Sequence, residues 1–193
     1  MVGHLETATG GKTYRLCHTQ SVTKPLYIQH LKEIFHDIIP PKGQVHRVYP
    51  TGKVTQGFRT RYSTLFTTYG QAFYRDGKKV LPLSIEKWLT PCALSFWYMN
   101  DGSMKSKQSK GVFLNTQCFS RREIELLCTL LTHKYNLLCW PRKLKKKQSG
   151  QIYISGRSYH TLSHLITPYF REDMWYKFPP PRTGEKVTHL PKE

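Results

Sequence analysis

The sequence predicts an α+β fold made of two similar halves, and two observations carry this prediction. A strand-like alternation followed by a helical stretch occurs twice, over residues 13–39 and again over residues 112–136. Each copy is followed by a hairpin pattern and then by another helical stretch. Strands and helices in this order are typical of α+β folds, and a pattern that repeats along the chain indicates an internal duplication.

The first half contains a strand, a helix, a hairpin and a second helix. Apolar Ile28, Leu31, Phe35 and Ile38 recur at helical spacing, which predicts an amphipathic helix after the first strand. In chain order the expected elements are a strand over 13–21, a helix over 25–39, a hairpin that pairs 44–51 with 58–64, and a helix over 65–74.

The second half repeats this order. Its first helix begins with Ser120 and carries Glu123 three residues later, which is the pattern of a capping box. Gln148, Ser149 and Gly150 form a good turn sequence for the hairpin. The expected elements are a strand over 112–118, a helix over 120–136, a hairpin that pairs 138–146 with 151–155, and a helix over 159–170.

An apolar helix precedes the first strand of the second half. Thr90 suits an N-cap and Pro91 suits the first helical position. Residues 94–99 are almost all apolar, and a helix that is apolar on every face is buried. Gly102 is expected to end the helix in a left-handed conformation, so that Asp101 brings one carboxylate to a surface or interface. A plain core helix that ends in an ordinary Asp-Gly turn is the alternative.

Composition bounds the class of partner. Lys and Arg number 30 against 12 Asp and Glu in 193 residues, so the formal net charge is +18. Such an excess attracts polyanions, and nucleic acid is the leading expected partner. No apolar run approaches the roughly 20 residues of a membrane-spanning helix, so no membrane partner is expected. The five cysteines include no C-x-x-C pair, which argues against a disulfide framework and a structural zinc site and favours a reducing compartment.

Residues 94–102 read LSFWYMNDG and resemble the motif that names the LAGLIDADG family of homing endonucleases. The flanking segments resemble the monomeric, two-repeat, intron-encoded members of that family from mitochondria. These segments are Leu89–Pro91, Val112–Ser120, Leu165–Tyr169 and Met174–Pro179. The resemblance covers roughly residues 1–179 and implies two αββαββα repeats whose antiparallel sheets form a saddle. It divides the chain into a first repeat over 1–78, a second repeat over 79–178, and an extended, proline-rich tail over 179–193.

The resemblance also implies a metal site that is incomplete in this sequence. Family members hydrolyse DNA with divalent metal held between two aspartates, one at the end of each motif helix. Asp101 matches the second aspartate, whereas the first falls at Val2, where the preceding motif helix is missing. Because valine offers no oxygen, Asp101 is expected to remain as half of a metal site. No cofactor is expected, except Mg²⁺ if endonuclease activity survives. Lys79 and Lys177 resemble the family's basic residues near the scissile phosphates, and solvated lysines are the alternative.

Basic residues recur on the expected strands. The densest run covers residues 142–147 in the second hairpin, and the first hairpin is basic as well. Alternation turns one face of a strand toward the helices and the other toward a partner, and Lys and Arg bind phosphates. Interleaved aromatic residues such as Trp140 could stack on unpaired bases, and a solvated face is the plain alternative. The expected nucleic-acid-binding residues are Lys12, Arg15, His18, Arg47, Arg59, Arg61, Arg142, Lys143, Lys145, Lys146 and Lys147.

Three functions stay open. The favoured one is an RNA-binding component of an organellar ribonucleoprotein, ribosomal or intron-splicing, that derives from the endonuclease fold and has lost cleavage. It predicts ribosomal or intron RNA in preference to duplex DNA, with other proteins of a large ribonucleoprotein as partners. The second is an active, site-specific homing DNA endonuclease or maturase that is truncated at its N-terminus or completed by another chain. The third is a protein-binding module whose charge is incidental. A mitochondrial location is expected, with the chloroplast as the alternative.

Overall fold

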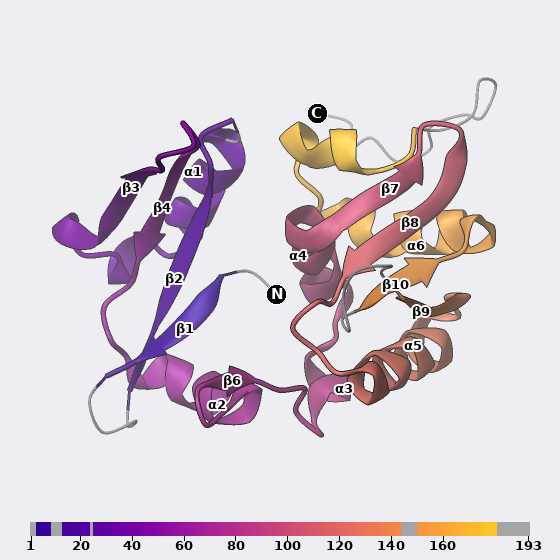
Figure 1. Ribbon diagram of the computed structural model, residues 1–193, viewed down its shortest axis with the longest axis horizontal. Coiled ribbons are helices and arrows are strands. Elements are labelled where there is room, and N and C mark those ends of the chain that lie inside the picture. Colours follow the sequence, from indigo (N-terminus) through magenta and orange to yellow (C-terminus); the bar gives the residue numbers. More distant parts are fainter. Residues whose placement is uncertain (1–2, 9–12, 24, 144–149, 181–193) are drawn as a thin grey trace. The chain divides into compact units, whose positions relative to one another are not determined.

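The computed structural model describes residues 3–8, 13–23, 25–143 and 150–180. The chain divides into two compact units, Met1–Lys78 and Lys79–Glu193 (Figure 1). Each unit contains one four-stranded antiparallel sheet together with helices that pack on it. None of the helices in the described part of the chain has the length and apolar character needed to span a bilayer.

The elements of the first unit follow one another as strand pairs separated by helices. They are β1 (His4–Thr7), β2 (Tyr14–Ser21), α1 (Pro25–Ile34), β3 (Gln44–Val48), β4 (Val54–Arg59) and α2 (Thr67–Phe73), with 3-10 turns at His36–Ile38, Pro41–Gly43 and Thr64–Phe66. The strand order in the sheet is β1-β2-β4-β3. The β1–β2 hairpin places His4 opposite Cys17 and Glu6 opposite Arg15.

The second unit contains the same pattern and one more helix. A short hairpin of β5 (Tyr74–Arg75) and β6 (Lys78–Lys79) comes before it in the chain. Its elements are α3 (Ile85–Trp88), α4 (Pro91–Asp101), β7 (Gly102–Ser106), β8 (Ser109–Asn115), α5 (Arg121–Tyr135), β9 (Cys139–Lys143), β10 (Gly150–Ile154) and α6 (Tyr159–Ile166), with 3-10 turns at Gly156–Ser158, Thr167–Tyr169 and Glu172–Lys177. The strand order is β7-β8-β10-β9.

The two sheets share one topology. In each of them a hairpin leads into a helix, and the fourth strand pairs between the second and the third. α1 and α5 therefore occupy the same place in the two units, as do α2 and α6. This repetition confirms the predicted α+β fold with internal duplication, and α4 to α6 complete one αββαββα repeat. Within its described residues, the first unit starts with β1 and shows no counterpart of α4.

The first sheet has one face covered by apolar packing and one face that carries charge. Leu16 and Phe58 are buried on the covered face, whereas Arg15 and Arg59 lie on the other face. His18 pairs opposite Phe58 and is only 3% exposed. The expectation that His18 extends the basic face is therefore wrong, because a side chain three positions from Arg15 points to the opposite face of a strand.

α4 is capped as predicted at its start and differs at its end. The Thr90 hydroxyl accepts a hydrogen bond from the Ala93 backbone N–H at 3.1 Å, and Pro91 occupies the first turn. Gly102 is extended, with φ −79° and ψ 155°, and not left-handed as expected. Glycine is needed here for a different reason. β7 begins directly after α4, and a Cβ at residue 102 would lie 2.5 Å from the Tyr98 carbonyl oxygen.

The first hairpin is shorter than predicted. β3 ends at Val48 instead of residue 51, and β4 begins at Val54, four residues before the expected start at residue 58. The sequence did not suggest a strand there because of Gly57. A Cβ at Gly57 would lie 1.9 Å from the backbone oxygen of His18, so glycine allows β4 to approach β2 closely. Of the expected tail over 179–193, residues 181–193 lie outside the described part.

Candidate nucleic-acid interface and metal site

A row of aromatic side chains crosses the second sheet on the face opposite to Val112, Leu114 and Ile152. Trp140, Tyr153 and Phe113 stand opposite one another on β9, β10 and β8. The ring centroids lie 5.0 Å apart for Trp140–Tyr153 and 5.3 Å apart for Phe113–Tyr153. We name this the open face of the second sheet. It comprises Lys105, Phe113, Asn115, Trp140, Arg142, Gln151 and Tyr153.

Two cations lie over this aromatic row. The Arg142 guanidinium carbon is 4.6 Å from the centroid of the Phe113 ring, and the Lys105 ammonium is 5.5 Å from that of Tyr153. Ring contacts of this kind hold flexible cationic side chains in place. Trp140 is 50% exposed whereas Phe113 is buried, so the row is accessible to a partner at its Trp140 end. Cations beside accessible rings suit a partner that offers both phosphates and bases.

An amide pair connects the open face to the end of α4. Gln151 Nε2 donates a hydrogen bond to Asn115 Oδ1 at 2.5 Å. Asn115 Nδ2 in turn donates to the backbone oxygen of Asp101 at 2.8 Å. Asn and Gln amides match the donor and acceptor of adenine in the major groove. A group suited to reading bases thus lies in direct contact with the residue predicted to bind metal.

The predicted residue Lys177 contacts the end of α4, whose last residue is the predicted residue Asp101. The Lys177 ammonium donates to the carbonyl oxygens of Met99 at 2.7 Å and Asn100 at 2.8 Å. The Tyr98 hydroxyl donates to the backbone oxygen of Lys177 at 2.9 Å, and burial raises the pKa of Tyr98, which keeps this donor protonated. A cation at the C-terminal end of a helix is stabilised by the helix dipole. Lys177 therefore holds the last turn of α4 in place beside Asp101.

The groups around Asp101 suit a hard divalent cation in part. A carboxylate is a ligand that Mg²⁺ prefers, and Mg²⁺ in proteins usually binds one or two carboxylates together with substrate phosphates. Asp101 is the last residue of α4 and is half-buried, and its backbone oxygen accepts a hydrogen bond from Asn115 on the open face. Val2, to which the resemblance assigns the first acid, lies outside the described residues.

The first sheet also carries basic residues on one face, but one of them is paired. Arg15 donates to Glu6 Oε2 from Nε at 2.8 Å and from Nη2 at 2.5 Å, and its guanidinium carbon lies 4.8 Å from the centroid of the Tyr62 ring. The Arg15 charge is therefore largely offset by Glu6. We name this surface the open face of the first sheet; it comprises His4, Glu6, Arg15, Cys17, Arg47 and Arg59.

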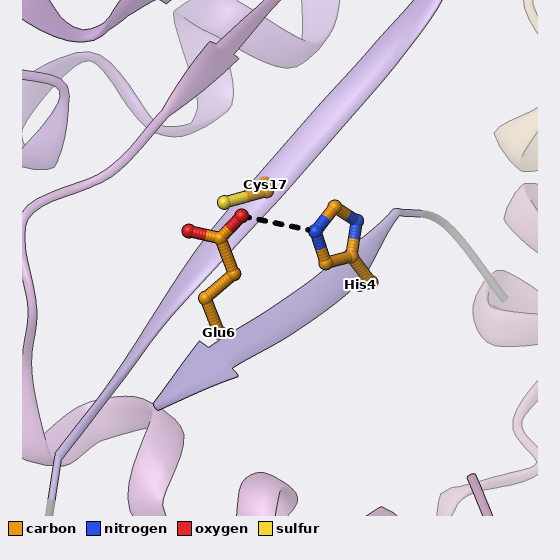
Figure 2. Close-up of side chains that lie close together, drawn as sticks. All are labelled: His4, Glu6 and Cys17. Carbon is orange, nitrogen blue, oxygen red and sulfur yellow. Dashed lines mark hydrogen bonds and ion pairs between the residues drawn. The ribbon is translucent and has the colours of Figure 1, made fainter. Parts of the chain in front are cut away.

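Glu6, His4 and Cys17 converge on this face (Figure 2). His4 Nε2 lies 3.2 Å from Glu6 Oε1. Burial alone would raise the pKa of Glu6, but hydrogen bonds from Arg15, Cys17 and His4 outweigh it and hold the pKa at about 2. Burial raises the pKa of the Cys17 thiol to about 11. Near neutral pH the carboxylate is therefore ionised and the thiol is protonated.

The other predicted binding residues are spread over both units. Arg61 is exposed in the segment after β4, and Lys79 lies in β6. Lys143 ends β9 and is exposed, but alternation points it to the face opposite to Arg142. The predicted residues Lys12, Lys145, Lys146 and Lys147 lie outside the described residues.

Sequence reasoning missed several residues of the open faces. The signal for Gln151 and Tyr153 was present, because buried Ile152 and Ile154 alternate with them along β10. Glu6 gave no comparable signal, because β1 has only four residues and no apolar alternation.

Solved structures share this fold. The homing endonuclease I-WcaI bound to its DNA recognition sequence matches with a TM-score of 0.81 at 26% identity, over 91% of this chain and 80% of that one. A structure of I-DmoI with its nicked target DNA matches with a TM-score of 0.50 at 12% identity, over 87% and 89% of the two chains, which supports the fold alone. Both proteins are homing endonucleases. The sequence profile of the LAGLIDADG DNA endonuclease family matches residues 2–162, and the chain belongs to this family.

The curated relatives are named as maturases and as intron-encoded endonucleases. The cytochrome b mRNA maturase bI2 of Saccharomyces cerevisiae is 30% identical over 91% of this chain and 44% of the maturase. This chain therefore spans less than half of that relative. An intron-encoded endonuclease of Wickerhamomyces canadensis is 30% identical over 78% of this chain and 68% of the relative. The intron-encoded endonuclease ai4 of Dictyostelium discoideum is 34% identical over 64% and 74%.

These comparisons confirm the resemblance to homing endonucleases and correct the favoured function. I-WcaI is bound to DNA and one relative is named an mRNA maturase, which agrees with the nucleic-acid partner that the charge predicts. The expectation of a cleavage-deficient RNA-binding component of an organellar ribonucleoprotein is wrong. The relatives are named as endonucleases and maturases, and the matching structure is a homing endonuclease on DNA. That expectation depended on Val2 and on the proline-rich tail. Val2 and residues 181–193 of the tail lie outside the described residues.

Proposed function

We propose that this chain recognises a site in duplex DNA and hydrolyses a phosphodiester bond there with a divalent cation bound at Asp101. The observation that carries the proposal is the hydrogen bond of 2.8 Å from Asn115 to the backbone oxygen of Asp101. It joins a sheet face suited to bases and phosphates to the backbone of the residue whose carboxylate matches the family's metal ligand. The likeness to I-WcaI, which binds a DNA recognition sequence, supports it.

Each group on the second sheet has a task in this proposal. Arg142 and Lys105 bind phosphates and fix the register of the protein on the duplex. Asn115 and Gln151 hydrogen-bond to base edges in the major groove. Lys177 holds the carbonyls of the last turn of α4 and thereby the position of Asp101. A bound Mg²⁺ would supply Lewis acidity toward a phosphoryl oxygen and lower the pKa of a bound water.

We expect the chain to cut one strand of the DNA duplex more readily than both strands. Asp101 is the one carboxylate that we assign to metal, and the remaining ligands would be water and DNA phosphate oxygens. By the resemblance, Val2 falls at the position of the family's first aspartate, and its side chain offers no oxygen. The substitution Val2→Asp is therefore expected to raise the yield of double-strand breaks relative to nicks.

The test is cleavage of supercoiled plasmids that carry a library of candidate target sites. With Mg²⁺ the chain is expected to nick a subset of sites, and Asp101→Asn is expected to abolish nicking but retain binding in Ca²⁺. Asp37→Asn makes the same chemical change at an exposed carboxylate and is expected to leave nicking unchanged. Equal nicking by Asp101→Asn and the native chain would refute the assignment of the metal ligand.

Intron RNA is a second candidate partner, and a specific observation favours it. Two of the relatives at about 30% identity are named cytochrome b mRNA maturases. The same names support the proposal of a mitochondrial location, since cytochrome b belongs to the respiratory chain. Competition between a labelled DNA target and intron RNA separates the two partners. Displacement of the DNA by equimolar intron RNA, but not by unrelated RNA of equal length, would favour the maturase function.

A further inference from the structure

The His4–Glu6–Cys17 cluster lies outside the surface assigned to metal above, and strand register explains why its side chains meet. β1 and β2 pair with His4 directly opposite Cys17. Glu6 stands two residues along β1, so its side chain points to the same face as that of His4. Directly opposite side chains on an antiparallel pair have Cβ atoms about 4.5–5.5 Å apart. The three side chains therefore converge on one point above the hairpin (Figure 2).

The distances suit a tetrahedral metal ion. His4 Nε2 and Glu6 Oε1 are 3.2 Å apart, and the ligand atoms of all three residues lie within 4.8 Å of one another. Zn²⁺ binds nitrogen and oxygen at about 2.0–2.1 Å and sulfur at about 2.3 Å, so neighbouring ligand atoms in a tetrahedron lie about 3.3–3.8 Å apart. The His4–Glu6 separation is just below this range, and Cys17 Sγ, which lies within 4.8 Å of both ligand atoms, would reach it by a side-chain rotation.

The remaining contacts prepare the cluster for a cation. Arg15 binds Glu6 through Oε2, which leaves Oε1 directed at His4. Carboxylates that ligate metal are commonly held by an outer hydrogen-bond partner of this kind. Cys17 is 3% exposed, whereas the His4 side chain is 55% exposed, so the site opens to solvent on the His4 side.

We propose that His4 Nε2, Glu6 Oε1 and Cys17 Sγ bind one Zn²⁺ ion. A set of nitrogen, oxygen and sulfur ligands suits Zn²⁺, whereas the oxygen donor of Asp101 suits Mg²⁺. Binding releases the thiol proton of Cys17 to solvent, and His4 binds as the neutral tautomer that carries its proton on Nδ1. A fourth position is left for water, and no oxidation state changes. The spacing of the cysteines could not reveal this site, because a single cysteine contributes and the other ligands come from the neighbouring strand.

The ion would attach an edge strand to its sheet. β1 has four residues and pairs within the described sheet only with β2. Zn²⁺ would link the two strands through His4 and Glu6 on one side and Cys17 on the other. It would also offset the negative charge of Glu6 next to the DNA phosphates that we expect near Arg47 and Arg59, and this consequence alone depends on the proposed function.

The test uses Co²⁺, which reports a thiolate ligand by a charge-transfer absorption band. Titration of the full chain, reduced and free of metal, is expected to give this band with one equivalent of Co²⁺, and Zn²⁺ should displace it. His4→Ala is expected to weaken binding at least about tenfold. Cys17→Ser should remove the band. Cys118→Ser, at an exposed cysteine outside the cluster, is the matched control and should leave it unchanged.

Two controls distinguish loss of zinc binding from unfolding and from loss of DNA cleavage. Because the His4 side chain is mostly exposed, His4→Ala should keep the native circular dichroism spectrum, and Zn²⁺ should raise the melting temperature of the native chain but not of this variant. Equal Co²⁺ affinity of the two, or a band that persists in Cys17→Ser, would overturn the proposal. Asp101→Asn should retain the band, so loss of DNA cleavage and loss of the zinc site give distinct outcomes.

Discussion

Glu6 shows how single contacts set the chemistry of a residue on a basic surface. It is a carboxylate on a face that also carries Arg15, Arg47 and Arg59, and the hydrogen bonds from Arg15 give it a depressed pKa. The same contacts turn Arg15 from a phosphate ligand into a structural partner. A count of cations in the sequence therefore overstates the charge that this face offers to DNA.

Replacing Glu6 with Gln is expected to make stability less sensitive to acid. The pKa of Glu6 is about 2 in the folded chain against an ordinary value of 4.5, so its contribution is complete above pH 4.5 and is lost as the pH falls toward 2. Because the side chain retains 29% exposure, that contribution is about 1–3 kcal/mol at neutral pH. Urea unfolding from pH 7 to pH 3, with chelator present, measures it. The free-energy difference between the two proteins should shrink as the pH falls, and a constant difference would contradict the prediction.

At the scale of the element, α4 is fixed at both ends by side chains. The Thr90 hydroxyl binds its first turn, and Lys177 binds its last turn through two carbonyl oxygens. Leu94, Tyr98 and Met99 are fully buried between these ends. The position of Asp101 thus depends on a residue 76 positions later in the sequence.

Lys177→Met is expected to lower the free energy of unfolding by about 1–3 kcal/mol, because two hydrogen bonds to a charged donor are lost at the end of α4. Chemical denaturation followed by tryptophan fluorescence measures the change. Lys78→Met, at an exposed position of β6, is the control and should change stability by less than about 0.5 kcal/mol. Equal midpoints for the two variants would show that Lys177 does not stabilise the helix end.

α5 offers a second test of capping. The Ser120 hydroxyl accepts from the Glu123 N–H at 3.4 Å, and Glu123 accepts from the Ser120 N–H at 2.7 Å and from the Leu81 N–H at 2.7 Å. Ser120→Ala is expected to cost about 1 kcal/mol of stability, and Glu123→Gln more, since it also affects the Leu81 segment. Glu125→Gln, which alters an exposed pair with Arg121, should cost less than about 0.5 kcal/mol. Thermal unfolding of the three variants ranks them, and the reverse order would contradict the contact with Leu81.

These elements show which features the sequence could predict. The capping box at Ser120 and the N-cap at Thr90 were predictable, because both depend on residues within one helical turn. The extended conformation of Gly102 and the early start of β4 were not, because strand pairing determines them. In the candidate site, Asp101 followed from its motif. The pairing of Glu6 with Arg15 did not, because β1 is too short to show alternation.

At the scale of the whole molecule, one strand topology occurs twice and supplies two open faces of different character. The face of the first sheet combines cations with Glu6, whereas that of the second combines cations with an aromatic row and an amide pair. With a net charge of +18, binding should depend strongly on salt. Substitution of the cations should therefore change the affinity for DNA, whereas substitution of the amide pair should change the sequence preference.

The basic run of the second hairpin is expected to contribute affinity without sequence preference. Each phosphate contact with Lys or Arg changes the slope of log K against log salt by about 0.9 on duplex DNA. Replacing Lys143, Lys145, Lys146 and Lys147 together with Gln should therefore lower the slope by about 2–4 units, equally for target and unrelated duplexes. A control with the same change of charge replaces four exposed residues outside the open faces, namely Lys42, Lys87, Arg122 and Arg157.

Fluorescence anisotropy over a series of salt concentrations measures both slopes, and the control should change its slope by less than about one unit. Gln151→Ala should do the opposite of the lysine variant. It should leave the slope unchanged but reduce the preference for target over unrelated DNA by about 1–3 kcal/mol, because an amide contact to a base edge is lost. If the lysine variant retains the native slope, the run is a solvated surface. If Gln151→Ala retains the native preference, the open face of the second sheet does not read bases.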